Sequence, residues 1–452
     1  MKREAQSTPG FQNVNPEILE PSLAEKAKQI RAQIPEHGLF ADKEWRISPE
    51  PFAIDARLHE EFEKLGPRLR RFCRVSDRLY RLSFEGKQPG WIAERLDAGK
   101  PPELVRLARD PRLENDLPGV IRPDILLTEG GWKITELDSV PGGIGLTGWL
   151  QKAYGHSTSM ARAFAETFSP ANGATAVVVS EEAAVYRPEM EWLVNQIKAG
   201  GSKTPWFVAA PDDLEFKNDA VFLNGVQLAL IYRFFELFDL PNLKHSSRLL
   251  DAALRGRILI TAPPKPVLEE KMLLALFWNE SLEGFWKREL GEEDFVELRK
   301  VIPQSWIVEP DARDWITLKN ASQKKRRFVL KLSGFSELAW GGRSLRIGHD
   351  LSTEHWAEAI DHALASFPKA PYVMQPFEKG RRVPIDWFDF EKNELVPMEG
   401  RVRLCPYYFG TTDARNDRDG VKLAGILATI CPPDKKVIHG MRDAVMTLAV
   451  KR

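Results

Sequence analysis

The chain has 452 residues, more than one hydrophobic core usually supports, so we expect two or three domains. Its 64 basic and 64 acidic residues balance, which argues against nucleic acid as a partner. The cysteines, Cys73, Cys405 and Cys431, lie far apart without metal-site spacing, which argues against a disulfide framework or a zinc site and favours a reduced cytoplasm.

The apolar stretches are short. The segment MLLALFW at 272–278 is among the longest, and a membrane-spanning helix needs about 20 apolar residues. The first residues, MKREAQSTPGFQNVNPE, lack the apolar core of a signal peptide. We therefore expect a soluble, cytoplasmic protein with no membrane partner, and the sequence indicates no oligomeric state.

Residues 1–115 are expected to form a helical N-terminal region. The stretches PSLAEKAKQIRAQI and HEEFEKLGPRLRRFCRVSDRLYRLSF place apolar residues three and four apart, the spacing of an amphipathic helix. Cys73 lies inside this pattern and is interpreted as a small core residue. We expect these helices to complete the core, since nothing in them identifies a partner.

A predicted hairpin follows from Val120. IRPDILL and WKITELD are expected strands, joined by a turn at 128–131. Side chains two apart on a strand share a face, so Arg122 lies beside Asp124, and Glu136 beside Asp138. If the strands pair, three carboxylates and a guanidinium converge, a set suited to Mg²⁺ and a phosphate. The alternative is an ordinary solvated strand face.

Residues 116–265 are predicted to form an α/β portion that carries these carboxylates. ATAVVVSEE, TPWFVAAP and NGVQLALIYRFFEL are expected strands, and EMEWLVNQIKAG is a helix between them. A proline cluster, Pro263, Pro264 and Pro266, marks the candidate boundary to a third portion, 266–452. The predicted fold class is therefore α/β (α+β).

A glycine-bearing loop is the second candidate site. In RRFVLKLSGFSELAWGGRSLRIG a strand ends at Lys331, and a loop with Gly334, Gly341 and Gly342 leads to a second strand. Backbone N–H groups of such a loop can approach phosphate oxygens, and the lysine supplies a point charge. The segment is neither a Walker loop nor GxGxxG. The alternative is a glycine-rich hairpin with an exposed lysine.

Two later strands complete the pattern. Residues 372–377 form a short apolar strand that can present its backbone to an adenine edge, with Gln375 and Glu378 as polar anchors. In PMEGRVRLCPYYFG, Arg401 and Arg403 alternate on one strand face, where they can meet a transferring phosphate. The alternative for residues 372–377 is a buried strand end. The alternative for the strand with Arg401 and Arg403 is an ordinary exposed strand.

Together the four stretches resemble the ATP-grasp superfamily, in particular the circularly permuted branch that includes glutathionylspermidine synthetases. In ordinary ATP-grasp chains the metal-binding carboxylates follow the lysine strand and the adenine hinge, whereas here they precede both. The synthetases carry R-x-D followed by E-x-N; here Asp138 replaces the asparagine. The resemblance covers residues 120–150 and 265–410.

The resemblance implies a role for each matched residue. Asp124, Glu136 and Asp138 would bind Mg²⁺, and Arg122, Arg343 and Arg403 would act on the transferring phosphoryl group. The nucleotide would contact Lys271, which opens the segment KMLLAL, together with Lys331, Gly341, Gly342, Tyr372 and Gln375.

The implied activity is an ADP-forming, ATP- and Mg-dependent ligation of a small-molecule carboxylate to an amine through an acyl phosphate. The glycine-rich segment 139–145 departs from the synthetases and argues against glutathione and spermidine as the substrates. Two alternatives stay open: a small-molecule kinase of the same fold, and a non-catalytic ATP-binding regulatory or scaffold protein. The acid and the amine are not identified by the sequence.

Overall fold

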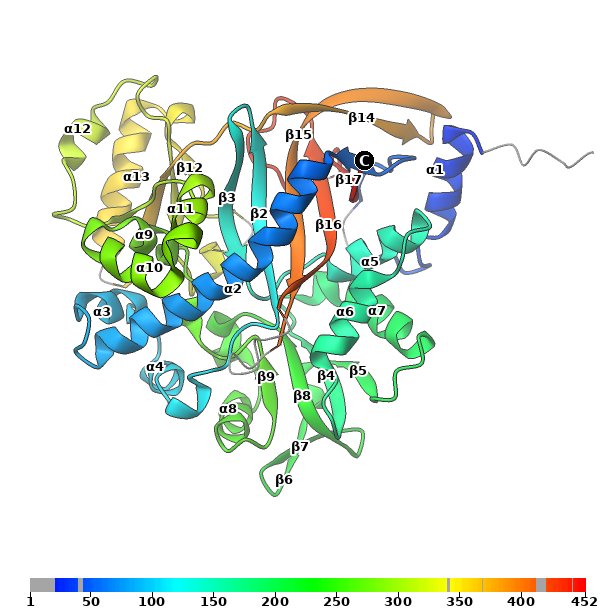
Figure 1. The fold of residues 1–452 in the computed structure, drawn as a ribbon, viewed down its shortest axis with the longest axis horizontal. Helices are drawn as coiled ribbons and strands as arrows, with labels where there is room; N and C mark the ends of the chain where they lie inside the picture. Colours follow the sequence, from blue (N-terminus) through cyan, green and yellow to red (C-terminus); the bar gives the residue numbers. More distant parts are fainter. Residues whose placement is uncertain (1–20, 40–43, 340–341, 368, 412–419, 441) are drawn as a thin grey trace, which may run out of the picture.

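The computed structural model describes residues 21–39, 44–339, 342–367, 369–411, 420–440 and 442–452. In these residues the strands form three sheets, and helices cover them (Figure 1). The large sheet lies in the centre of the view, with the smallest sheet at one side and the partly parallel sheet below.

The large sheet combines strands from distant parts of the sequence. Its order is β1-β17-β16-β15-β2-β3, and β14 pairs with the first half of the long strand β15. All neighbours are antiparallel except β1 and β17. The strands are β1 (Phe52–Ile54), β2 (Val120–Thr128), β3 (Gly131–Asp138), β14 (Arg382–Asp389), β15 (Glu394–Phe409), β16 (Lys422–Cys431) and β17 (Val445–Lys451).

The six-stranded sheet is built from the middle of the chain. Its strands β5, β4, β8 and β9 run parallel, and β7 and β6 add an antiparallel extension. The central strand β4 is buried along its whole length, which explains its continuous run of Ala, Thr and Val. The strands are β4 (Ala174–Val179), β5 (Trp206–Ala209), β6 (Glu215–Lys217), β7 (Ala220–Leu223), β8 (Val226–Phe234) and β9 (Leu259–Thr261).

The four-stranded sheet is antiparallel, in the order β10-β13-β11-β12. Helix α13 (Thr353–Ser366) packs on it through Trp356 and Ile360, which are fully buried. This sheet carries the predicted lysine strand and the predicted adenine strand side by side. Its strands are β10 (Trp306–Val308), β11 (Phe328–Leu332), β12 (Arg346–Ile347) and β13 (Tyr372–Pro376).

Helix α2 (Ala56–Phe84) crosses the face of the large sheet diagonally (Figure 1). Asp55 caps its start by accepting a hydrogen bond from the Leu58 N–H at 2.8 Å. The other helices of the N-terminal region are α1 (Leu23–Ala32), α3 (Trp91–Asp97) and α4 (Pro102–Ala108). Helices α2 and α3 contribute to the main core.

The remaining helices cover the other sheets. In the middle of the chain they are α5 (Ile144–Ala153), α6 (Ser159–Phe168), α7 (Arg187–Ala199) and α8 (Ser246–Leu254). After the proline cluster they are α9 (Met272–Trp278), α10 (Glu283–Leu290), α11 (Glu292–Val301), α12 (Trp315–Lys319) and α13 (Thr353–Ser366). Among the residues described, no helix has both the length and the apolar character that crossing a bilayer requires.

The predicted hairpin is confirmed: β2 and β3 pair antiparallel, with Thr128 opposite Gly131 at the turn. Strands from residues 116–265 and from 266–452 nevertheless share the large sheet, since β2 pairs with β15. The proline cluster therefore does not separate two independent sheets, and the three domain ranges stay predictions. The cysteines are buried and unpaired.

Trp286 joins the N-terminal helices to the later helices. Its ring stacks on Phe72 of α2 with centroids 5.4 Å apart, and its Nε1 donates to the Leu276 carbonyl at 2.9 Å. We expect Trp286→Ala to lower the free energy of unfolding by about 3–5 kcal/mol, because it leaves a cavity in the main core. Chemical denaturation measures the effect, with Val296→Ala, at a residue that is 40% exposed, as the control. Equal stability of the two variants would contradict the packing described here.

Candidate active site

A cavity of about 620 Å³ lies at the carboxyl ends of β4 and β8. The hairpin of β2 and β3 forms one wall, and strands β11, β13 and β15 contribute others. Its size is within the range of small-molecule sites, and carboxyl ends of parallel strands are where α/β sheets usually bind ligands. Ten of the twelve residues to which the resemblance gives a role line this cavity; Tyr372 does not, and Gly341 falls outside the described residues.

Arg122 lies between two carboxylates of the hairpin. The register places Arg122 opposite Asp138 and Asp124 opposite Glu136, so the predicted convergence is present. The Arg122 guanidinium donates to Asp124 at 3.1 Å, to Asp138 at 3.0 Å and to the Gly142 carbonyl at 3.0 Å. These three contacts fix the guanidinium at the cavity wall.

Asp124 is the shared acceptor of two arginines. Besides Arg122, it accepts from Arg403 of β15 at 2.8 Å, and the Cys405 thiol donates to it at 3.4 Å. Burial alone would raise the pKa of Asp124, but Arg122 and Arg403 hold it down at about 2. The Nε atom of Arg403 is buried with no hydrogen-bond partner, so this cation keeps a free donor.

The two predicted nucleotide lysines lie beside Glu136. Lys271 approaches the Glu136 carboxylate at 3.2 Å and donates to the Ala339 carbonyl at 3.0 Å. Lys331 donates to the Thr135 carbonyl at 3.0 Å, and burial lowers its pKa to about 8. A bound anion would favour the charged form of Lys331.

The three carboxylates predicted to bind a metal all line the cavity, and their joint role as ligands stays a prediction. In the described part of the chain, no three His, Cys, Asp or Glu side chains are arranged to hold a metal ion. The physical reason is that both Asp124 oxygens already face Arg122 and Arg403. Glu136 and Asp138 stay partly open to the cavity, with side chains 37% and 28% exposed. Two carboxylates fit Mg²⁺, which takes its other ligands from water and phosphates.

The predicted adenine strand reaches the cavity with its last residues. Gln375 and Glu378 line it, and Gln375 donates to Ser305 at 2.9 Å. Val329 and Ile347 of the same sheet add apolar surface. Tyr372 does not reach the cavity, because it packs in the core between the four-stranded sheet and α13.

The glycine loop contributes from its second half. Gly342 and Arg343 line the cavity, and the Arg343 guanidinium lies 3.6 Å from the Glu182 carboxylate. Gly341 falls outside the described residues. Arg401, although on the same strand face as Arg403, donates to the Pro433 and Gly380 carbonyls and does not line the cavity.

One wall of the cavity was not predicted from the sequence. Ser180, Glu182 and Tyr186 follow β4, and Phe235 and Glu236 follow β8. A usable signal was present, since the buried run LALIYRFF ends directly at a glutamate. The C-terminal segment 436–440, which also lines the cavity, carried no such signal.

Glu236 belongs to an acidic group at this wall. Burial, together with the carboxylates of Glu269 and Asp138, raises the pKa of Glu236 to about 8. The fully buried Arg233 pairs with Glu269 behind it and donates to the Ala262 carbonyl at 2.8 Å. This wall therefore presents a carboxyl group whose neutral form is favoured by its surroundings.

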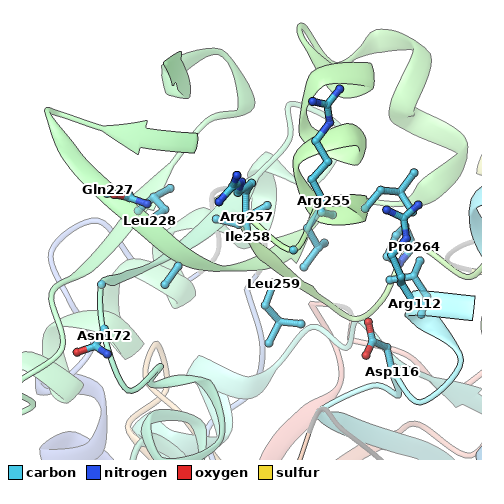
Figure 2. A pocket seen from close by; sticks show the side chains of 17 residues that line it. Arg112, Asp116, Asn172, Gln227, Leu228, Arg255, Arg257, Ile258, Leu259 and Pro264 are labelled. Carbon is cyan, nitrogen blue, oxygen red and sulfur yellow. The ribbon is translucent and has the colours of Figure 1, made fainter. Parts of the chain in front are cut away.

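A second hollow, of about 710 Å³, lies by the amino ends of β8 and β9 (Figure 2). Arg112, Arg255 and Arg257 surround its apolar floor, which includes Ile258 and Leu259. Arg112 is paired with Asp110, and Arg255 with Asp219. The predicted site residues are all absent from its lining, so the first cavity is the candidate active site.

The comparisons with known proteins concern the fold. No family model and no curated protein matches the chain. A glutathione synthetase-like effector from Globodera pallida, solved in its apo form, superposes with a TM-score of 0.58 at 13% identity, covering 95% of this chain and 97% of that one. A provisionally named gamma-glutamylcysteine synthetase from Methylobacillus flagellatus reaches 0.39 at 10% identity, covering 76% and 82%. The chain therefore shares a mixed α/β fold with the first of these structures.

The raised pKa of Glu236 predicts a pH-dependent stability. Its neutral form is favoured by folding, so this contribution is complete below about pH 4.5 and is lost as the pH rises through about 8. We expect Glu236→Gln to be more stable than wild type above pH 8, by more than about 1 kcal/mol, with the difference vanishing near pH 4.5. Denaturant unfolding at several pH values tests this, with Glu129→Gln at the exposed hairpin turn as the control. A difference that does not change with pH would contradict it.

Proposed function

We propose that this protein is an ATP- and Mg-dependent, ADP-forming ligase that joins a carboxylate to an amine. The single observation that carries the proposal is the cation cluster at the cavity. Arg122, Arg403, Lys271 and Lys331 surround one space together with the carboxylates of Glu136 and Asp138. Such a set suits a triphosphate and its metal ion.

The nucleotide would lie between the four-stranded sheet and the hairpin. Gln375 and Glu378 would contact the base at its polar edge, and Val329 and Ile347 would pack on its faces. Lys271 and Lys331 would then meet the phosphates from the side of Glu136. Arg343, on the glycine loop, would approach from the opposite wall.

Glu136 and Asp138 would hold Mg²⁺, which neutralises phosphate charge when bound. Asp124 has a different role in this proposal from the one that the resemblance implies. It orients Arg122 and Arg403, and the free Nε donor of Arg403 would bind the phosphoryl oxygens. Phosphoryl transfer leaves the protein mainly with positioning and charge stabilisation.

In the reaction, an oxygen of the substrate carboxylate attacks the γ-phosphorus, and the bond from that phosphorus to the β,γ-bridging oxygen breaks. ADP leaves with this electron pair, and the acyl phosphate forms. The amine then attacks the acyl carbon, phosphate leaves, and the amine gives up a proton to a base or to water. No covalent nucleophile of the protein is needed. Burial and the Asp124 charge raise the pKa of the Cys405 thiol to about 12, so it is not a nucleophile.

The two substrates would occupy the wall formed by Ser180, Tyr186 and Glu236, beside the segment Gly142–Gly143. Gly143 has φ of +85°, and a Cβ there would come within 2.6 Å of the Tyr407 hydroxyl. The segment is thereby held close to Arg122, which donates to the Gly142 carbonyl. A carboxylate bound at this place would lie next to the transferring phosphate.

We also propose that the motif order reflects a circular permutation of the ATP-grasp arrangement. The hairpin with the acidic residues precedes the lysine strand in the chain, yet Lys331 hydrogen-bonds to the hairpin at Thr135. Contact between elements in reversed sequence order is what a permutation requires.

Release of ADP during a screen of carboxylate and amine pairs tests the activity. We expect Arg403→Met to lower kcat by about 10²–10³, because it removes a donor to the transferring phosphate. Arg401→Met, two positions away on the same strand and outside the cavity, is the matched control. A stable phosphorylated product formed without an amine would identify a kinase instead. Equal rates of both variants and wild type would contradict the role of Arg403.

A further inference from the structure

Lys100 and Glu270 form a buried ion pair beside the candidate site. The Lys100 Nζ lies 2.6 Å from the Glu270 carboxylate, and their side chains are 2% and 3% exposed. Lys100 belongs to the loop between α3 and α4, within the N-terminal region that the sequence left without a role. Burying two charges costs free energy unless further hydrogen bonds satisfy them. The second carboxylate oxygen of Glu270 therefore needs a hydrogen-bond donor of its own.

That second oxygen accepts a hydrogen bond from the Ser333 hydroxyl. Ser333 is the first residue after β11, the strand of Lys331. The same hydroxyl accepts from the Met272 N–H at 2.9 Å, and the Ser333 carbonyl accepts from the Lys271 N–H at 3.0 Å. One serine therefore connects the buried pair to the backbone that carries a cavity lysine.

The start of the glycine loop closes tightly over this pair. At Gly334 a Cβ would lie 2.8 Å from the Glu270 carboxyl carbon, so a larger residue would displace the carboxylate or the loop. Phe335 follows with φ of +48°, a conformation that a bulky residue rarely adopts. Its ring centroid lies 5.7 Å from the Lys100 Nζ, within the range of a cation–π contact.

We propose that Lys100, Glu270 and Ser333 form an anchor that fixes the start of the glycine loop and the backbone of Lys271 relative to each other. The anchor residues are positioning residues, since none of the three lines the cavity. They act through Lys271 and through the loop that leaves Ser333. The effect of the anchor on nucleotide binding rests on the function proposed above. The effect of the anchor on the glycine loop does not depend on that function.

Two readouts separate this role from general stability. The first is the dissociation constant of Mg-ATP, measured by calorimetry on the purified full chain. The second is backbone hydrogen exchange of residues 332–339 and of Met272 in the ligand-free protein. We expect Lys100→Met and the milder Ser333→Ala each to weaken Mg-ATP binding about tenfold and to accelerate exchange in these segments by a similar factor.

Lys265→Met is the matched control. Lys265 forms an equally buried pair with Asp77 at 3.0 Å, also between the N-terminal region and the segment after β9. Its Nζ contacts Asp77 and the carbonyls of Glu114 and Asp116 rather than the glycine loop. This substitution should lower stability without the local changes in exchange or affinity. If Lys100→Met and Ser333→Ala change both readouts no more than Lys265→Met does, the anchor is refuted.

The two proposals fail in different ways. Absence of Mg-ATP binding in wild type would refute the proposed function, and hydrogen exchange would still decide on the anchor. Tight binding in wild type with unchanged exchange and affinity in Ser333→Ala would refute the anchor alone. Because Ser333→Ala removes a single hydroxyl, it keeps the test valid if Lys100→Met does not fold.

Discussion

The sharing of one buried carboxylate by two arginines is the interaction on which the candidate site depends. Asp124 of β2 accepts from Arg122 of the same strand and from Arg403 of β15, so it links two neighbouring strands of the large sheet. Each guanidinium is thereby held in one orientation, with an Arg403 donor left over. A receptor that is rigid before its anion arrives loses less entropy on binding.

The rest of the fold supplies what this arrangement needs. The hairpin turns Glu136 and Asp138 toward the same space, and the carboxyl ends of β4 and β8 add a wall with Glu236. The four-stranded sheet brings Lys331 to within 3.0 Å of the Thr135 carbonyl. Three sheets built from separate parts of the chain thus meet at one cavity, and the N-terminal helices pack behind it.

Much of the site followed from short-range rules. Alternation along two strands and one turn signal predicted that Arg122, Asp124, Glu136 and Asp138 converge, because both rules act within about ten residues. The pairing of Asp124 with Arg403 was not predicted, for a long-range reason. Arg403 is far from Asp124 in the sequence, and no local pattern shows that it occupies the carboxylate.

The parts that sequence reasoning missed depend on contacts of the same long-range kind. Tyr372 belongs to a strand with the apolar sequence of a binding strand. Its side chain nevertheless packs in the core against α13, which the sequence of the strand does not show. Lys100 resembles any surface lysine until its pairing with Glu270 is seen. The mixed α/β fold was predictable because strand and helix patterns along the chain agreed with one another, and such agreement is stronger than any one pattern.

The most direct test of the central claim is an equilibrium one. Thermal unfolding of wild type and of Asp124→Asn is measured with and without Mg-ATP. The comparison shows how the Asp124 carboxylate, which Arg122 and Arg403 share, affects nucleotide binding. Mg-ATP at a hundred times its dissociation constant should stabilise wild type by about 2.7 kcal/mol. The same concentration should stabilise Asp124→Asn much less, because Arg122 and Arg403 lose their common partner. Equal stabilisation of both proteins, or none in wild type, would contradict the role of the Asp124 interaction.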